Sequence, residues 1–271
     1  MTTPQARILF LAWISIAAIL GGQTVGVLRS RPLPSPQEIA NLESRVLQSP
    51  EDIDARVELL QIYADTAPPP AYDNPARRSV RLQHILYLVE RHPETAASAS
   101  KAAYVYRSNG PYANAGDHDA VRSQWLAAVQ AHPTDKGVVM NAVKFLNVED
   151  PEDAEEALRR AIAADLADRE IAANLGFQYA LEILGKAPEI ASHATAELEQ
   201  SSNAIVLAGA GTALPNLAMR ATAGRMVDPK IFTLASELSA RARKLAPDDA
   251  DIQGPMPLIK YFSEFSVPEP R

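Results

Sequence analysis

Hydrophobic and polar positions along the chain alternate with the period of helices, interrupted by short Pro, Asp and Gly signals. After Asp52, for example, Val57, Leu60 and Ala64 fall on one helical face. We find no stretch with the strict two-residue alternation of a half-buried strand. The pattern therefore predicts an all-α protein.

Start signals divide this pattern into separate helices. Ser35-Pro36-Gln37-Glu38 is a capping box with Pro at the first helical position. Asp150-Pro151 and Asp228-Pro229 combine a cap with a Pro in the first turn, and Asp117 or Asp119 is the expected cap of another helix. The expected helices cover approximately 36–48, 52–65, 76–91, 95–107, 118–131, 135–147, 151–164, 169–184, 189–201, 203–213, 216–226, 229–245 and 256–265.

The first 28 residues form an apolar segment unlike the rest of the chain. Arg7 precedes about 13 apolar residues, a layout typical of a secretory signal peptide. The run weakens after Leu20 but continues to Leu28, which is long enough for a signal anchor. We therefore predict a signal peptide or signal anchor over 1–28 and a Pro-rich spacer over 29–35.

Both interpretations place the rest of the chain outside the cytoplasm, in the periplasm or another extracytoplasmic space. An uncleaved segment 8–28 would anchor it in the inner membrane and provide its membrane contact. A buried core helix is the third alternative. The positive charges do not decide the orientation, because Arg7 lies on one side of the segment and Arg29 and Arg31 on the other.

One motif points to internal repeats. Leu175-Gly176 is followed by Tyr179, and 34 residues earlier Ala142 and Phe145 occupy the positions of the Gly and the Tyr. Around these residues the chain resembles the tetratricopeptide repeat family. The match is best at 135–184 and degenerate elsewhere.

The resemblance implies a TPR-like right-handed solenoid of helical pairs over 36–266, preceded by the hydrophobic segment and followed by a tail at 267–271. Gly176 would allow close approach of two helices, and Tyr179 would pack in the core between them. The stretch 185–228 fits no clean unit, so we expect irregular stacking there.

The family binds ligands along the concave surface made by the first helices of its units. Carried over to this chain, that surface implies a groove in which Val139, Val143 and Phe177 are partly exposed. The predicted partner-binding residues are Gln61, Lys136, Val139, Val143, Glu170 and Phe177. A mostly apolar groove favours a protein segment with hydrophobic anchors.

Composition removes several classes of function. The chain has no Cys and therefore no disulfide or thiolate metal site, and its net charge of −7 argues against a nucleic-acid binder. Asp117-His118-Asp119 could supply metal ligands, but neighbouring helical residues point in different directions. We predict no metal and no cofactor.

The remaining candidate motifs have structural explanations. Gly209-Ala-Gly211 has no preceding strand and favours close helix packing over phosphate binding. The carboxylate pairs Glu155-Glu156 and Asp248-Asp249 are expected on solvated faces. Basic clusters, including that around Arg241, are expected beside the core or in ion pairs.

These observations favour a non-catalytic, exported or membrane-tethered scaffold that binds protein segments. One alternative is an accessory subunit of an envelope assembly machine, such as the tetratricopeptide component of cytochrome c maturation. Another is an enzyme whose site lies in 185–228. The partner's identity and the oligomeric state are not predicted.

Overall fold

The computed structural model describes residues 34–65, 75–108, 113–164, 168–185, 187–221 and 227–253. Within these ranges all regular structure is helical and no strand is present, so the all-α prediction is confirmed. The helices are α1 (Pro36–Gln48), α2 (Ile53–Asp65), α3 (Pro75–Arg91), the 3₁₀ turn η3 (Lys101–Ala103), α4 (Ala115–Ala131), α5 (Lys136–Leu146), α6 (Pro151–Ala163), α7 (Arg169–Leu184), α8 (Pro188–Gln200), α9 (Ala204–Ala221), α10 (Pro229–Leu245) and α11 (Ala250–Gln253).

Several predictions fall outside the described residues. They concern the hydrophobic segment 1–28, most of the spacer 29–35, the helix at 256–265 and the tail 267–271.

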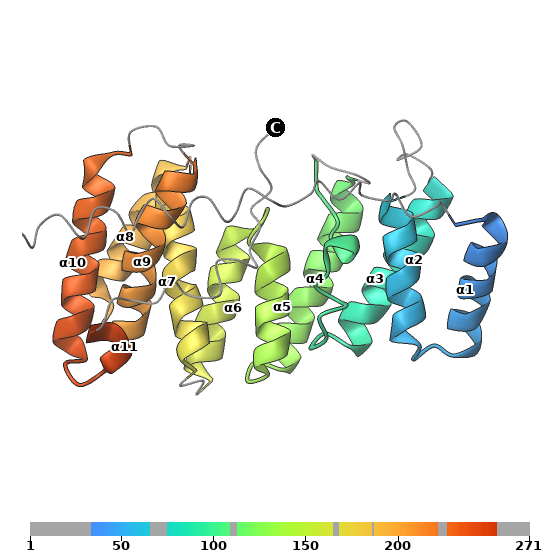
Figure 1. Cartoon of the computed structure of the whole chain (residues 1–271), viewed down its shortest axis with the longest axis horizontal. Helices are drawn as coiled ribbons and strands as arrows, with labels where there is room; N and C mark the ends of the chain where they lie inside the picture. Colours follow the sequence, from blue (N-terminus) through green and yellow to red (C-terminus); the bar gives the residue numbers. More distant parts are fainter. Residues whose placement is uncertain are drawn as a thin grey trace, which may run out of the picture. The chain divides into compact units, whose positions relative to one another are not determined.

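Neighbouring helices pack against each other along the unit that begins at Pro36 (Figure 1). From α1 to α8, each α-helix contacts the next one in the chain. The order then changes, because α9 packs on α7 and α10, and its contact with α7 is the most extensive between any two described helices. The apolar faces that the sequence pattern predicts are therefore buried between helices.

A continuous hydrophobic core runs from α2 to α11 and includes the fully buried side chains of Trp125, Leu158 and Leu207. A smaller cluster, centred on Leu59 and Tyr63, joins α1 and α2. Helices that are neighbours along the chain therefore bury apolar surface against one another.

Glycines bring the backbones of α7 and α9 into contact. A Cβ atom added to Gly176 would lie 2.7 Å from the backbone nitrogen of Ala210, and closer still to the carbonyl oxygen of Val206. A Cβ atom added to Gly209 would lie 2.6 Å from the carbonyl oxygen of Ala173. Close helix packing at Gly176 and in the Gly209 segment is therefore confirmed.

The prediction of two helices at 203–213 and 216–226 is wrong. The described part of this stretch is one helix, α9, with Pro215 inside it. Pro costs a helix one backbone hydrogen bond, but burial against both α7 and α10 outweighs that loss. By length and composition α9 could cross a membrane, yet half of it is buried in the fold, as in a core helix.

The predicted helix at 95–107 is also wrong, since only the short turn η3 forms there. Side chains from other helices bind the carbonyl groups that this helix would need. Asn141 on α5 donates to the carbonyl oxygens of Pro93 and Thr95, at 2.9 and 2.8 Å. Arg81 on α3 donates to two further carbonyl oxygens of the segment, each at 2.7 Å. These hydrogen bonds, one buried and three partly buried, stabilise the non-helical path.

The helix caps agree with the sequence signals in part. Asp52 accepts a hydrogen bond from the backbone nitrogen of Ala55 at 3.0 Å, and Asp228 caps α10 in the same way. The cap of α4 was expected at Asp117 or Asp119 but is Asn114, whose side chain accepts from the backbone nitrogen of Asp117 at 2.9 Å. An Asn three residues upstream provides the better cap geometry, so α4 begins earlier than predicted.

Candidate functional site

The three apolar residues predicted to line the groove are buried. Val139, Val143 and Phe177 have exposed fractions of 0%, 1% and 5%, and all belong to the main core. Tyr179 is buried as expected, at 3%. The expected partial exposure of the first three is therefore wrong, because α5 and α7 are covered on more than one side by neighbouring helices.

The polar members of the predicted groove remain accessible. Lys136 at the start of α5 forms ion pairs with Glu170 and with Asp168, the latter at 3.1 Å. The hydrogen bond that Lys136 donates to the Glu170 carboxylate raises the pKa of Lys136. Gln61 is exposed but lies on α2, several helices away in the chain. The structure thus brings Lys136 and Glu170 together and leaves Gln61 apart from them.

A buried ionic network lies where the non-helical segment meets α4 and α6. The His118 ring donates from Nδ1 to the carbonyl oxygen of Val105 and approaches Asp150 with Nε2, both at 2.7 Å. Arg107 reaches the same Asp150 carboxylate at 2.8 Å. Asp150 therefore does not cap α6 with its side chain, although the sequence predicts that role.

This arrangement also separates the three candidate metal ligands. His118 points into the core, whereas Asp117 pairs with Arg78 at 3.1 Å and Asp119 pairs with Arg107 at 2.9 Å. Among the described residues no group of three or more His, Cys, Asp or Glu side chains is placed to hold a metal ion. The network instead joins helices that are distant in sequence.

A second network joins α1, α2 and α3. Arg56 donates to Nδ1 of His84 at 3.0 Å, so the ring proton is assigned to Nε2, which lies 3.4 Å from the Glu43 carboxylate. Burial disfavours the charged imidazolium and so lowers the pKa of His84, in agreement with this neutral form.

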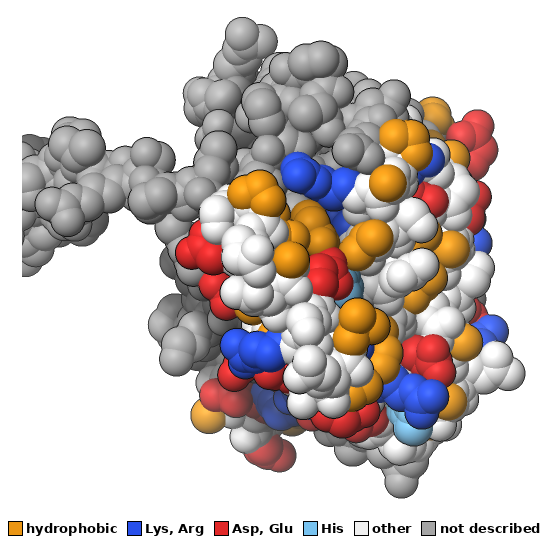
Figure 2. Space-filling view, turned by 90° about the vertical axis from the view of Figure 1, so that its right-hand side faces the viewer, with side chains coloured by type: hydrophobic (Ala, Val, Ile, Leu, Met, Phe, Trp, Pro, Cys, Tyr) orange, Lys and Arg blue, Asp and Glu red, His pale blue; other side chains and the backbone are white. Residues whose placement is uncertain are grey.

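On the face of the molecule at the α1 end, hydrophobic, acidic and basic side chains are intermixed (Figure 2).

A third network connects α6, α7 and α8. The Glu155 carboxylate accepts hydrogen bonds from Arg159 at 3.1 Å and from Tyr179 at 3.3 Å, and His193 lies 3.3 Å from it. Glu155 is buried, so its expected position on a solvated face is wrong, whereas Glu156 is exposed as expected. The error arises because α7 and α8 cover the side of α6 that carries Glu155.

The basic cluster at the end of α10 contains a helix cap. The guanidinium group of Arg241 donates to the carbonyl oxygens of Leu198, Glu199 and Ser201, at 3.0, 3.0 and 3.1 Å. These carbonyls end α8, where a cation is electrostatically favourable. Arg241 therefore holds α10 against the end of α8.

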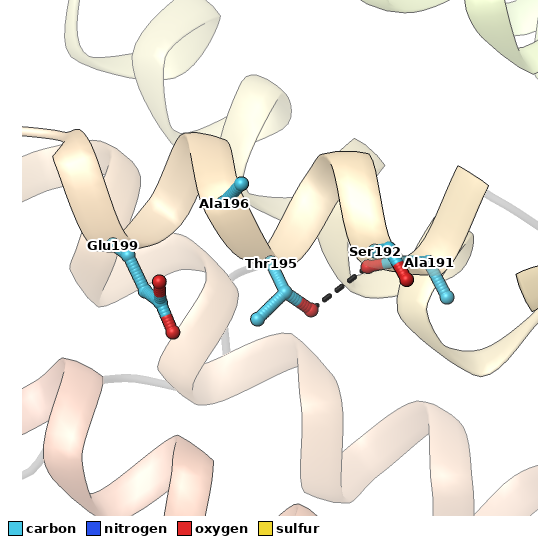
Figure 3. A pocket seen from close by; sticks show the side chains of 5 residues that line it. All are labelled: Ala191, Ser192, Thr195, Ala196 and Glu199. Carbon is cyan, nitrogen blue, oxygen red and sulfur yellow. Dashed lines mark hydrogen bonds between the residues drawn. The ribbon is translucent and has the colours of Figure 1, made fainter. Parts of the chain in front are cut away.

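A shallow pocket of about 330 Å³ lies on α8 and is lined by Ala191, Ser192, Thr195, Ala196 and Glu199 (Figure 3). Its residues are small, and the Thr195 hydroxyl donates to the carbonyl oxygen of Ala191 at 2.8 Å. Glu199 is its one titratable side chain. The pocket thus brings together no set of acid, base and nucleophile.

Comparison with known proteins gives no match to a family model, to a curated protein or to a solved structure.

Proposed function

We propose that this chain is a non-catalytic, TPR-like helical scaffold that binds protein segments. The observation that carries the proposal is the direct packing of α7 on α9, past α8, at Gly176. In a solenoid of helical pairs, first helices of neighbouring units contact each other in this way. The spacing agrees with that arrangement, since α5, α7 and α9 begin at residues 136, 169 and 204, which are 33 and 35 residues apart.

The polar chemistry of the fold also favours a scaffold. Asp150 and Glu155 are buried, and each bonds to side chains of other helices. The guanidinium group of Arg241 donates a hydrogen bond to a carbonyl oxygen at the end of α8. Carboxylate and guanidinium groups, which often perform catalysis, here form hydrogen bonds between helices. These hydrogen bonds stabilise the relative positions of the helices.

The binding surface that we propose differs from the apolar groove of the sequence analysis, because Val139, Val143 and Phe177 belong to the core. It lies instead across the first turns of α5 and α7, where Lys136 and Glu170 are accessible. A cation beside a carboxylate suits a segment with polar or charged side chains, and such pairs contribute more to specificity than to affinity.

A photo-reactive amino acid at Lys136 tests this surface in the source cell. We expect covalent capture of a partner protein from this position, because it faces the proposed surface. The matched control is position 156, which is exposed on α6. It is not part of the proposed surface. Equal capture from both positions, or capture from position 156 alone, would contradict the proposed surface.

We further propose that the scaffold works outside the cytoplasm, exported or tethered by residues 8–28. The support is the apolar run after Arg7 and the Pro-rich stretch that follows it. Residues 1–40 fused to a reporter that is active only after export should give activity. Activity from a fusion to a reporter that works only in the cytoplasm would refute this part of the proposal.

A further inference from the structure

The last turn of α7 contains a buried carboxyl group without a cationic partner. Glu182 is 4% exposed, and its Oε1 accepts a hydrogen bond from Nε2 of Gln178 at 2.8 Å. Its second oxygen, Oε2, is buried and has no hydrogen-bond partner in the described structure. The same Gln178 Nε2 donates to the carbonyl oxygen of Pro151 at 3.0 Å. Gln178 therefore connects Glu182 to the first residue of α6.

Among the titratable groups that the described helices packed against α7 place near Glu182, His193 is the only one whose charge favours the ionised carboxylate. From α6, Glu152 and Glu155 face Glu182, and from α8 His193 does. The third neighbour, α9, has no titratable side chain before Arg220. Glu182 also lies at the C-terminal end of its own helix, where a negative charge is unfavourable. An ionised Glu182 would therefore be a buried anion with one neutral hydrogen bond.

Burial raises the pKa of Glu182 from 4.5 to about 7. The hydrogen bond from Gln178 and the charge of His193 act in the opposite direction, and the charges of Glu155 and Glu152 raise the pKa further. The direction agrees with the geometry, since burial and like charges both favour the neutral acid.

We propose that Glu182 and Gln178 form a proton-dependent contact that holds the last turn of α7 against α6 and loosens when the Glu182 carboxyl group releases its proton to solvent. In the protonated state, the carboxyl group is neutral and fits the buried site. In the ionised state, local opening lets water reach the carboxylate.

The sign of the pH dependence follows from linkage. Below about pH 4.5 the carboxyl group is protonated in both the closed and the opened state, so pH has no effect through this group. Between about 4.5 and 7 the opened state releases a proton and the closed state does not, so the equilibrium constant for opening rises about tenfold per pH unit. Above about pH 7 both states are ionised and the effect levels off.

Hydrogen exchange on the full chain tests this proposal. Amide protection in the last turn of α7 is measured between pH 5 and 7.5 and corrected for the intrinsic exchange rate. In the wild-type chain we expect opening to increase about tenfold per pH unit up to pH 7. In Glu182→Gln, which has the shape of the protonated acid, we expect no such increase. The control Glu156→Gln removes an exposed carboxylate from α6 and should behave as the wild-type chain.

Parallel pH profiles for the wild-type chain and Glu182→Gln would overturn the proposal. A second measurement needs no substitution of Glu182. The carboxyl ¹³C chemical shift of Glu182 in the wild-type chain should titrate near pH 7, and Gln178→Ala should move that midpoint upward because it removes the hydrogen bond to the carboxylate. A midpoint below about 5, the range of an ordinary Glu, would also overturn it.

Discussion

Replacing Gly176 by Ala tests the contact between α7 and α9. In an exposed helix this change stabilises by about 1 kcal/mol, because Ala has the higher helix propensity. Here the new Cβ would overlap the carbonyl oxygen of Val206 and lie 2.7 Å from the nitrogen of Ala210. Both atoms belong to the backbone of α9 and cannot rotate away, so the overpacking cost lies at the upper end of the usual 1 to 3 kcal/mol, about 3. The net expectation is a loss of about 2 kcal/mol.

Thermal and urea unfolding measure this loss, and the chain offers a matched control. Gly116 lies in the first turn of α4, where an added Cβ would meet only the side-chain oxygen of Asn114, at 3.3 Å. Gly116→Ala should leave the stability unchanged or raise it by up to about 1 kcal/mol. Gly176→Ala should lower Tm by about 4 to 8 °C. If Gly176→Ala were as stable as Gly116→Ala, the backbones of α7 and α9 would not be in contact and the reasoning would be refuted.

Three further substitutions address the core and the buried polar groups, each measured by urea unfolding. Asn141→Leu should cost about 1 to 3 kcal/mol, because the carbonyl groups of Pro93 and Thr95 are then left with the Ser98 hydroxyl, which can donate to only one of them at a time. A gain in stability would contradict the hydrogen bonds described. Asp150→Asn should cost about 1.5 to 3 kcal/mol, because it removes the carboxylate that is hydrogen-bonded to His118 and Arg107. A change within about 0.5 kcal/mol, the usual effect of a surface substitution, would show that these hydrogen bonds do not form. Phe177→Ala should lower the free energy of unfolding by about 3 to 5 kcal/mol, because the Phe177 side chain is buried, with an exposed fraction of 5%. An unchanged stability would indicate that Phe177 is exposed.

The parts of the fold that the sequence predicts depend on local signals. Helix starts at Pro36, Pro151 and Pro229 are predicted by a polar residue followed by Pro, and the structure places helices at these positions, although Asp150 does not cap α6 with its side chain. The close approach at Gly176 follows from a motif within five residues. Such features need no knowledge of which helices become neighbours.

The errors concern contacts between residues distant in the sequence. The segment 95–107 has helical periodicity, but Asn141 on a later helix donates hydrogen bonds to the carbonyl oxygens of Pro93 and Thr95 at its start. Val139 and Phe177 were placed on an open face because the pattern alone does not say which helix covers that face. A signal was nevertheless present, since Asn141 stands among the apolar residues of α5, and a polar residue at a core position requires a partner.

The ionic networks were not predicted for the same reason. His118 and Asp150 are 32 residues apart, and the motifs in which they stand, a possible metal site and a helix start, do not indicate that the two side chains meet. Glu155 and Tyr179 lie on different helices and meet only after α6 and α7 pack. Periodicity places a residue on a helical face, whereas the partner of a buried charge depends on the register between helices.

The proposed binding surface requires the first turns of α5 and α7 to lie side by side, although α6 separates these helices in the chain. Lys136 and Glu170 form a direct ion pair there, so a zero-length carbodiimide reagent should join them through an amide bond. Mass spectrometry of the digested, folded monomer should identify the peptide pair containing Lys136 and Glu170. Lys144, near the other end of α5, should not be joined to Glu170. Absence of the Lys136 product, with Lys144 joined to Glu170 instead, would contradict the arrangement on which the proposed scaffold rests.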